Sequence, residues 1–325
     1  MTVSTVLAVV EHEHGEPAET SLEALTLARE VAGVTDAALA VVAFGAEGGG
    51  VAEQLGAYGV ETVHHVDVGL DGYAPQAWGG SVAQLVTEVD PEAVVAPGSD
   101  RGHEVLTHVA ASHDLPMAAG CLDVDPGEAY ELTRQRWGGS LVEHARLEAP
   151  TKLLTAAEHE HPIEEAAEAT DPSVEPFEPD LADEQRRVAL DRLEESDVEG
   201  VPLGEARVVV GGGRGVGGPD GYDQLEELAD LLGGAVGASR AAVNEGWRSH
   251  DSQIGLTGTK ISPDVYIACG ISGAVQHMVG CKGASNILAI NTDPEAAIMQ
   301  KAEYAVVGDL HEVVPELNEA IRAER

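Results

Sequence analysis

Short apolar segments recur along the chain, each followed by a stretch with helical periodicity, and this alternation is the strongest constraint on the fold. In the first half the apolar segments are residues 6–10, 38–44, 62–68 and 93–96. They are almost continuously apolar, as strands are when both faces of a sheet are buried. Such strands, separated by helices, are typical of a parallel sheet covered by helices. The sequence therefore predicts an α/β fold.

The pattern changes twice before it returns. Residues 117–157 look like antiparallel strands added to the sheet edge, with a turn at Gly138 and Gly139. Earlier in the chain, Thr20 with Glu23 suggests a capping box at the start of a helix. Residues 158–203 are rich in Glu, Asp and Pro. We therefore expect an N-terminal parallel-sheet, nucleotide-hydrolase-like domain over 1–157 and an acidic linker over 158–203 with one short helix near 181–193. A C-terminal doubly wound domain over 204–325 completes the prediction.

The chain is strongly acidic, with 57 Asp and Glu against 18 Lys and Arg, a net charge of −39. This charge repels phosphate backbones and anionic lipid headgroups, so we expect neither nucleic-acid binding nor direct membrane insertion. No apolar run approaches the ~18 residues that span a bilayer. Because the acidic residues are spread along the whole chain, we interpret the charge as a halophilic adaptation of a cytoplasmic protein, in which salt screens self-repulsion.

A glycine cluster, residues 211–218, follows the first predicted strand of the C-terminal domain. Gly213, Gly215 and Gly218 match the G-x-G-x-x-G dinucleotide fingerprint, but the acidic residue expected after the second strand is replaced by Ser239 and Arg240. A plain NAD site is therefore disfavoured. An NADP site stays open, since Arg240 could hold a 2′-phosphate, and so does the interpretation that the glycines only form tight turns.

Polar and glycine-rich loops also follow the other strands of this domain. Residues 254–258 precede the third strand, 270–273 follow it, Asn291 and Asp293 follow the fourth, and Asp309 follows the fifth. Ligands of open parallel sheets bind beyond the carboxyl ends of the strands, where these loops meet. The sequence thus predicts one extended dinucleotide site.

Three motifs in this region, GASRAA (237–242), PDVYIACGISGAVQH (263–277) and AINTDPEA (289–296), resemble the α subunit of electron-transfer flavoproteins. The resemblance covers residues 206–314 and extends more loosely to APGSDRGHEV, LPMAAGC and RQRWGGS in the first half. It implies FAD bound in the second domain and a heterodimer with a β subunit.

The resemblance also implies roles for individual residues. Arg240 would lie against the isoalloxazine ring, Thr257 near flavin N5, and His277 by the C2 carbonyl. Leu256 departs from the Gln that the family often carries at this position. The remaining residues would surround the pyrophosphate, ribityl chain and adenosine: Arg214, Ser239, Ile254, Gly255, Ser272, Gly273, Ala274, Val275, Gln276, Asn291, Asp309 and Leu310.

Arg240 and His277 suit a flavin that passes electrons singly. An anionic semiquinone carries negative charge near N1 and the C2 carbonyl, and a cation about 5 Å away at an effective dielectric near 20 stabilises it by roughly 3 kcal/mol. Arg240 is permanently charged and His277 is titratable. The resemblance implies an electron carrier rather than an enzyme, with the flavin supplying the redox chemistry.

The implied partners are dehydrogenases as donors, such as the acyl-CoA dehydrogenases of fatty acid β-oxidation, and a membrane quinone oxidoreductase as acceptor. Simple relay and electron bifurcation both remain open. So do two other classes of function: an NADP-dependent oxidoreductase or transhydrogenase-like domain, and a non-redox adenine-nucleotide sensor built on the first domain. No metal site is expected, because the His-x-His pairs at 12–14 and 159–161 lack a third ligand.

Overall fold

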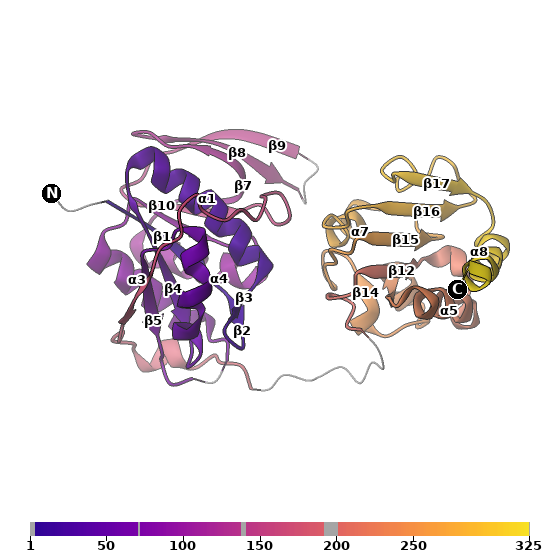
Figure 1. The fold of residues 1–325 in the computed structure, drawn as a ribbon, viewed down its shortest axis with the longest axis horizontal. Coiled ribbons are helices and arrows are strands. Elements are labelled where there is room, and N and C mark those ends of the chain that lie inside the picture. The colour runs from indigo at the N-terminus through magenta and orange to yellow at the C-terminus, as the bar shows by residue number, and fades with distance from the viewer. Residues whose placement is uncertain (1–3, 71, 138–140, 192–200, 325) are drawn as a thin grey trace. The chain divides into compact units, whose positions relative to one another are not determined.

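The computed structural model describes residues 4–70, 72–137, 141–191 and 201–324. The chain forms two compact units, Met1–Leu193 and Glu194–Arg325. Each unit contains its own sheet, built mainly from parallel strands (Figure 1). The predicted α/β architecture is confirmed.

The sheet of the first unit has nine strands within the described residues, in the order β11-β5-β4-β1-β6-β10-β7-β8-β9. Pairings from β11 to β7 are parallel, whereas β7–β8 and β8–β9 are antiparallel. The predicted antiparallel edge is thus confirmed for β7, β8 and β9, but residues 152–156 form an interior strand that is parallel to β6 and β7. The turn predicted at Gly138 and Gly139 lies outside the described residues. The strands are β1 (Thr5–Val10), β4 (Ala38–Phe44), β5 (Thr62–Val66), β6 (Ala93–Ala96), β7 (Met117–Asp125), β8 (Tyr130–Arg136), β9 (Leu141–Leu147), β10 (Lys152–Ala156) and β11 (Ser173–Pro176).

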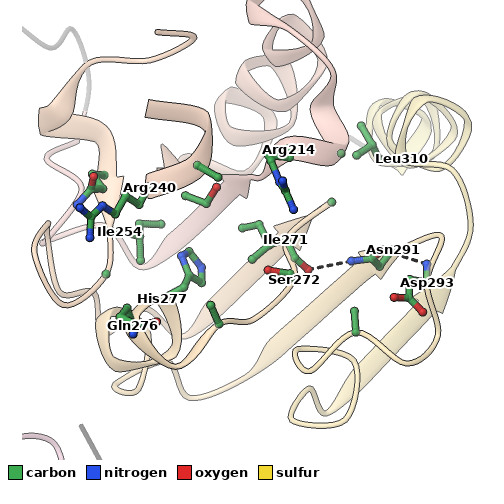
Figure 2. Close-up of a pocket in the computed structure, with 18 of the residues that line it drawn as sticks. Arg214, Arg240, Ile254, Ile271, Ser272, Gln276, His277, Asn291, Asp293 and Leu310 are labelled. Carbon is green, nitrogen blue, oxygen red and sulfur yellow. Dashed lines mark hydrogen bonds between the residues drawn. The ribbon is translucent and has the colours of Figure 1, made fainter. Parts of the chain in front are cut away.

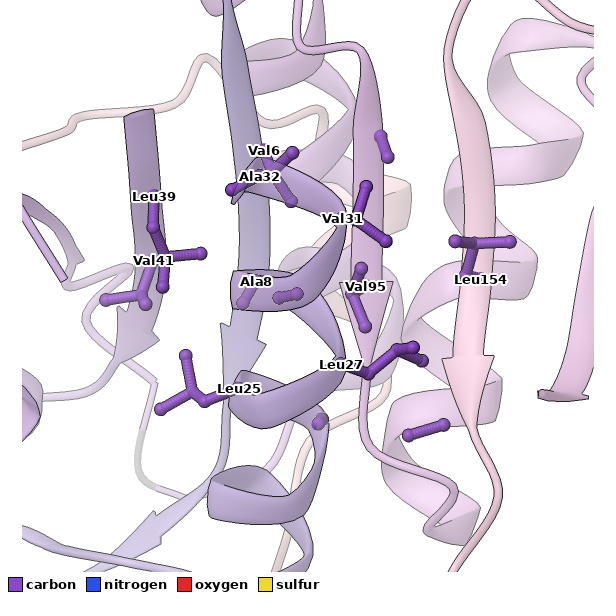
Figure 3. Packing of buried hydrophobic residues seen from close by; sticks show 14 of the residues in the cluster. Val6, Ala8, Leu25, Leu27, Val31, Ala32, Leu39, Val41, Val95 and Leu154 are labelled. Atoms are coloured by element: carbon purple, nitrogen blue, oxygen red, sulfur yellow. The ribbon is translucent and has the colours of Figure 1, made fainter. Parts of the chain in front are cut away.

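Alternate residues of β1 divide the core of this unit into two layers. Val6 and Ala8 pack with α1 (Glu19–Thr35) on one face of the sheet (Figure 3). Leu7 and Val9 pack on the other face with α3 (Pro75–Val89) and α4 (Asp100–His113). Because both faces are covered, β1 is apolar at every position from Val6 to Val10, as the sequence predicted.

The start of α1 differs from the predicted capping box. The helix begins at Glu19 after Ala18, without a side-chain cap, so Thr20 lies inside it. Glu23 instead accepts a hydrogen bond from the backbone N–H of His159 at 2.9 Å. The Glu23 carboxylate, which the capping-box pattern predicted to bond at the start of the helix, is bonded instead to a residue 136 positions away.

Residues 158–191 of the predicted linker pack on the first unit, whereas residues 201–203 belong to the second. Strand β11 extends the sheet beside β5, and Arg29 binds the backbone carbonyl of Glu164 at 2.7 Å. The helix predicted near 181–193 is reduced to a 3₁₀ turn, Asp183–Arg186. Strand β11 is held by backbone pairing to a distant strand, which the polar composition of the segment does not reveal.

The sheet of the second unit is entirely parallel within the described residues, in the order β14-β13-β12-β15-β16-β17. The chain runs outward from β12 to one edge, then returns to β15 and runs to the other edge. The loops after β12 and β15 therefore diverge and leave a crevice, the usual ligand position in doubly wound sheets. The strands are β12 (Val208–Gly212), β13 (Ala235–Ser239), β14 (Gln253–Ile254), β15 (Val265–Cys269), β16 (Ile287–Asn291) and β17 (Tyr304–Val307).

Helices α5 (Asp223–Leu232) and α8 (Leu310–Glu324) cover one face of this sheet, with Leu225, Leu228 and Val314 in the core. Two short helices, α6 (Arg240–Asn244) and α7 (Val275–Gly280), begin at or just beyond the carboxyl ends of β13 and β15. Among the described residues of both units, no helix has the length and apolar character needed to cross a membrane.

Candidate functional site

A cavity of about 550 Å³ lies at the carboxyl ends of the strands in the second unit. Arg240 and His277 lie toward one end, and Asn291, Asp293 and Leu310 toward the other (Figure 2). The full lining is Arg214, Gly215, Ser239, Arg240, Ala241, Asn244, Gln253, Ile254, Gly255, Leu256, Thr257, Gly270, Ile271, Ser272, Ala274, Gln276, His277, Asn291, Thr292, Asp293, Ala296, Gly308, Asp309 and Leu310.

Most of the predicted site residues line this cavity, but Gly273 and Val275 do not. A Cβ at position 273 would overlap the backbone of Ile298, and its φ of +79° favours glycine, so Gly273 shapes the loop. The side chain of Val275 is exposed. Both residues are sequence neighbours of lining residues but contribute no surface to the cavity themselves.

Two lining residues that the sequence interpretation passed over carry polar side chains near Arg240. Asn244 lies four residues after Arg240 on α6, and Gln253 donates to the Thr257 hydroxyl at 3.1 Å. The i, i+4 spacing from Arg240 was the available signal for Asn244. For Gln253 no such signal existed, since it is buried in a two-residue strand.

The glycine cluster joins two loops, and the N–H groups of two of its glycines are already engaged. Gly213 donates to the carbonyl of Cys269 at 2.9 Å, and Gly215 donates to that of Gly270 at 3.1 Å. A Cβ at Gly213 would overlap the Gly270 carbonyl, so only glycine permits this approach. The fingerprint match therefore reflects loop packing, and these two N–H groups are not free to bind a dinucleotide phosphate as the NADP alternative requires.

Free backbone donors lie instead in the loop between β15 and α7. Among the described residues, the N–H groups of Ser272 and Gly273 have no hydrogen-bond acceptor. The loop is fixed through its carbonyl groups, because Asn291 Nδ2 donates to the Ile271 carbonyl at 2.8 Å and the Ile298 N–H donates to the Ser272 carbonyl at 3.3 Å. Oriented donors of this kind suit a phosphate group.

Positive charge at the cavity comes from Arg214 and Arg240, both exposed. Within the described part of the chain, neither guanidinium has a carboxylate at ion-pairing distance. Arg240 is presented by a short helix whose N-cap, Ser239, accepts from the Ala242 N–H at 3.4 Å. In a chain with a net charge of −39, this is a local surface suited to an anionic ligand.

His277 differs from the titratable cation that the sequence predicted. It is 7% exposed, and burial lowers its pKa to about 4, so its imidazole is neutral near pH 7. Its Nε2 lies 2.8 Å from the Tyr266 hydroxyl. Arg240 is therefore the permanent charge at this end of the cavity, whereas His277 can only supply a hydrogen bond.

Leu256 follows Gly255 in a loop that lines the site. Its side chain is half exposed, and its N–H donates to the Gln276 carbonyl at 2.7 Å. The backbone bond, which any residue could make, holds this loop against the start of α7. Replacement of a polar residue by leucine here leaves that loop anchor unchanged.

At the carboxyl edge of the first sheet, side chains of the chain itself bond to one another and to the start of α4. Glu11, directly after β1, is 8% exposed and accepts a hydrogen bond from the Ser99 hydroxyl. Ser99 also caps α4 by accepting from the Gly102 N–H at 2.9 Å, and His103 Nδ1 lies 2.8 Å from the Ser99 carbonyl. A carboxylate thus occupies the helix N-terminus where a nucleotide phosphate would bind.

The histidine and cysteine clusters form no further site. No group of three potential metal ligands occurs among the described residues. Cys121, Cys269 and Cys281 are buried and free, and burial raises the pKa of each thiol to about 12.

Comparison with known proteins assigns both units to one family. Residues 6–182 match the electron transfer flavoprotein domain, and residues 202–282 match the electron transfer flavoprotein FAD-binding domain. The chain is 34% identical over 318 residues to the electron transfer flavoprotein subunit alpha of Thermoanaerobacterium thermosaccharolyticum, covering 96% of each chain. It is 33% identical to the Bacillus subtilis subunit alpha, covering 98% of this chain and 97% of that one. Identity to the mitochondrial subunit alpha of Dictyostelium discoideum is 34%, covering 99% and 93%.

Proposed function

The chain belongs to the electron transfer flavoprotein α-subunit family, and from this premise we propose that it binds FAD in the cavity of its second unit and carries electrons. The FAD-binding domain match covers the glycine loop, Arg240 and His277. The observation that supports the placement is the convergence of polar and glycine-rich loops on one cavity, with two guanidinium groups in its wall that have no ion-pairing carboxylate among the described residues.

The cavity has features that fit a long anionic dinucleotide. The N–H group of Ser272, which lines the cavity, would hold the pyrophosphate, and Asn291 and Asp309 would lie on the adenosine side. Arg240 and Thr257 would contact the isoalloxazine end, and the buried Nδ1 of His277 has no hydrogen-bond partner among the described residues. An unpaired polar atom in the wall is what a ligand acceptor would satisfy.

FAD, when bound, accepts and releases electrons one or two at a time, and the chain's own residues set how easily it does so. Arg240 contributes positive potential at the ring end. Because its side chain is exposed, water screens that potential to less than the full value for a buried charge. His277, neutral near pH 7, contributes a hydrogen bond rather than a charge.

The family also suggests the wider role. We propose a heterodimer with a β subunit, electron donation by dehydrogenases such as acyl-CoA dehydrogenases of fatty acid β-oxidation, and delivery to a quinone oxidoreductase. These partners rest on family precedent alone. Mixing the purified heterodimer with each candidate donor and measuring the reduction of its flavin tests these partners directly. If no acyl-CoA dehydrogenase reduces the flavin, that class of donor is excluded.

Arg240→Ala tests the placement of the flavin ring. We expect the purified heterodimer to keep FAD but to show a midpoint potential lower by roughly tens of millivolts, since an exposed charge near the ring is removed. Arg207→Ala is the matched control, because Arg207 is an exposed arginine paired with Asp264 at 2.6 Å and does not line the cavity. Equal potentials in both variants would contradict the placement.

The charge of the chain supports a second part of the proposal, a cytoplasm rich in salt. With a net charge of −39, self-repulsion destabilises the fold at low ionic strength. We expect the melting temperature to rise steeply between about 0.1 and 2 M KCl, because added salt screens the repulsion between the acidic side chains. A melting temperature independent of KCl would oppose a halophilic adaptation.

A further inference from the structure

Residues 177–190 form a strap on the first unit, between strand β11 and the residues that lead to the second unit. The strap has no regular secondary structure apart from the 3₁₀ turn at Asp183–Arg186. Its side chains differ in burial along its length. Leu181 is 8% exposed and packs in the core layer that contains α3, whereas every residue from 186 to 190 is exposed. The attachment of the strap therefore weakens toward the end that leads to the second unit.

The first half of the strap is held on α3 by a reciprocal pair of hydrogen bonds. Gln84 Nε2 donates to the Asp180 carbonyl at 2.8 Å, and the Asp180 N–H donates to Gln84 Oε1 at 2.9 Å. Directly after this pair, Leu181 lies against Gly80 of α3, where an added Cβ would meet the leucine side chain. Polar and apolar contacts act together here, so this half is firmly docked.

The second half, residues 186–190, is held by two hydrogen bonds to the loop after β5, and we call it the clip. The Arg186 guanidinium donates to the Val68 carbonyl at 2.7 Å. The Leu190 N–H donates to the Tyr73 carbonyl at 2.8 Å. Because the clip residues are exposed, water competes for these donors, and two hydrogen bonds with little apolar burial are a weak attachment. The clip can therefore open while the first half of the strap stays docked.

The loop that receives the clip is fixed by its own contacts. The Tyr73 hydroxyl donates to the Glu104 carboxylate at 2.8 Å, and the Tyr73 ring meets Trp78 edge-on with centroids 5.1 Å apart. A Cβ at Gly72 would overlap the Leu190 side chain, so glycine leaves the space in which this side chain sits. Of the two partners, the clip is the one with fewer contacts, and it is the one that moves.

Charge opposes the docking of the strap. The strap carries four carboxylates and two arginines, in a chain with a net charge of −39. Among the described residues, its ion pair is internal, between Arg187 and Glu184 at 3.0 Å, and none joins it to the rest of the first unit. Repulsion between exposed charges extends about 10 Å at 0.1 M salt and about 3 Å at 1 M. Added salt therefore favours the docked strap, and low salt releases its weakest part first.

We propose that residues 186–190 are a salt-dependent clip, docked on the 68–73 loop at high ionic strength and released at low ionic strength while both units stay folded. Residues 192–200 follow the clip in sequence and lead to the second unit. Release adds the length of the clip, roughly 17 Å when extended, to the segment that joins the two units. The clip does not involve FAD, so its salt dependence is independent of the proposed function.

Hydrogen exchange of the purified heterodimer in about 0.2 M and about 3 M KCl tests the clip. We expect the Leu190 N–H to exchange at least about tenfold faster at the lower salt, after correction with an unstructured peptide of the same sequence. The Asp180 N–H and the strand Ala38–Phe44 should change by less than about threefold. Equal protection of the Leu190 N–H at both salt concentrations overturns the proposal. Loss of protection in the clip and the strand together also overturns it, because the unit then unfolds as a whole.

Two arginine variants separate the hydrogen bond from the charge. Arg186→Gln removes the bond to Val68, whereas Arg187→Gln changes the charge equally and removes only the internal ion pair. In about 3 M KCl, we expect the Leu190 N–H to exchange about 3- to 10-fold faster in Arg186→Gln and at the wild-type rate in Arg187→Gln. Equal rates in the two variants would mean that the two anchors do not open together, and the clip would not exist as a unit.

The length of the connection is measured with spin labels. Leu190→Pro removes the N–H that bonds to Tyr73, and Val188→Pro is the matched control, because the Val188 N–H has no acceptor among the described residues. Labels at the exposed positions Glu53→Cys and Glu319→Cys, one in each unit, report the distances between the units. In about 3 M KCl, we expect distances in Leu190→Pro to extend up to roughly 17 Å beyond those in Val188→Pro. Identical distance distributions would overturn the inference that the clip sets the length of the connection.

Discussion

The carboxyl edges of the two sheets in this chain differ in which groups occupy them. In the first unit, Glu11 and Ser99 close the carboxyl edge with a carboxylate at the start of α4. In the second unit, the corresponding edge is a cavity with Arg214 and Arg240 in its wall. Both units use a parallel sheet with helices on its faces, so the capacity to bind an anionic dinucleotide is decided by the loops and not by the architecture.

The comparison bears on the adenine-nucleotide sensor that the sequence left open. A phosphate approaching α4 of the first unit would meet the Glu11 carboxyl group, which is already bound to Ser99. In the equivalent position the second unit offers the N–H group of Ser272, which has no acceptor in the described part of the chain. The structure therefore supports nucleotide binding in the second unit and opposes it in the first.

Burial shifts one titratable group in each edge, and the two shifts have opposite consequences. Burial raises the pKa of Glu11 and lowers that of His277. The stability that Glu11 contributes is present below its unfolded pKa near 4.5 and is lost as pH rises through its folded value. The contribution of His277 is present above its unfolded pKa of 6.5 and is lost as pH falls toward 4.

The largest expected effect comes from the loop contact that shapes the open edge. Gly213→Ala forces a Cβ against the Gly270 carbonyl, so we expect a stability loss of about 1–3 kcal/mol and a drop in FAD affinity of at least roughly tenfold. Chemical denaturation and flavin titration measure both effects. Gly218→Ala is the control, since Gly218 has extended backbone and open space at its Cβ position.

Gly102→Ala makes the same kind of change in the closed edge, where a Cβ would overlap the Pro97 carbonyl. It should destabilise the first unit and leave FAD affinity unchanged. The contrast between the two edges breaks down if Gly102→Ala weakens FAD binding as much as Gly213→Ala does.

The second effect tests the sign of the His277 shift. Between pH 6.5 and 4 the wild-type chain should lose up to about 3 kcal/mol through this residue, because the unfolded state binds a proton that the folded state excludes. His277→Gln removes that dependence, which urea unfolding at several pH values will show. His250→Gln, at an exposed site, serves as the control. Identical pH slopes for wild type and His277→Gln would refute the shift.

The smallest effect concerns Glu11. Glu11→Gln keeps an oxygen acceptor for the Ser99 hydroxyl, so the free energy of unfolding at neutral pH should change by less than about 1 kcal/mol. The substitution should also remove the decrease in the free energy of unfolding that ionisation of Glu11 causes above pH 4.5. Glu11→Ala, which leaves the hydroxyl without its acceptor, should cost about 1–2 kcal/mol. Glu13→Gln at the neighbouring exposed position is the comparison, and a pH profile unchanged in Glu11→Gln would show that its carboxyl is not responsible.

Regular elements were predictable wherever the deciding interactions are local. The strand Ala38–Phe44 was predicted at both ends, because an uninterrupted apolar run defines it. The start of α1 was not, since the partner of Glu23 lies at His159. Strand β11 was missed because backbone pairing to β5 holds a segment whose side chains are exposed.

The site followed a similar division. Glycine and polar residues after each strand located the cavity correctly. The sequence could not show that the N–H groups of Gly213 and Gly215 are spent on the neighbouring loop, nor that His277 is neutral. Both facts depend on which atoms the fold brings together, and Tyr266, outside the cavity but bonded to His277, became visible for the same reason.

The three buried thiols make each unit report its own unfolding. Burial raises the pKa of each thiol to about 12, so the reactive thiolate is scarce at pH 7 and an alkylating reagent is nearly inert toward the native chain. Cys121 lies in the first unit, and Cys269 and Cys281 lie in the second. Mass-resolved alkylation over time therefore reads how often each half opens, without any label being introduced.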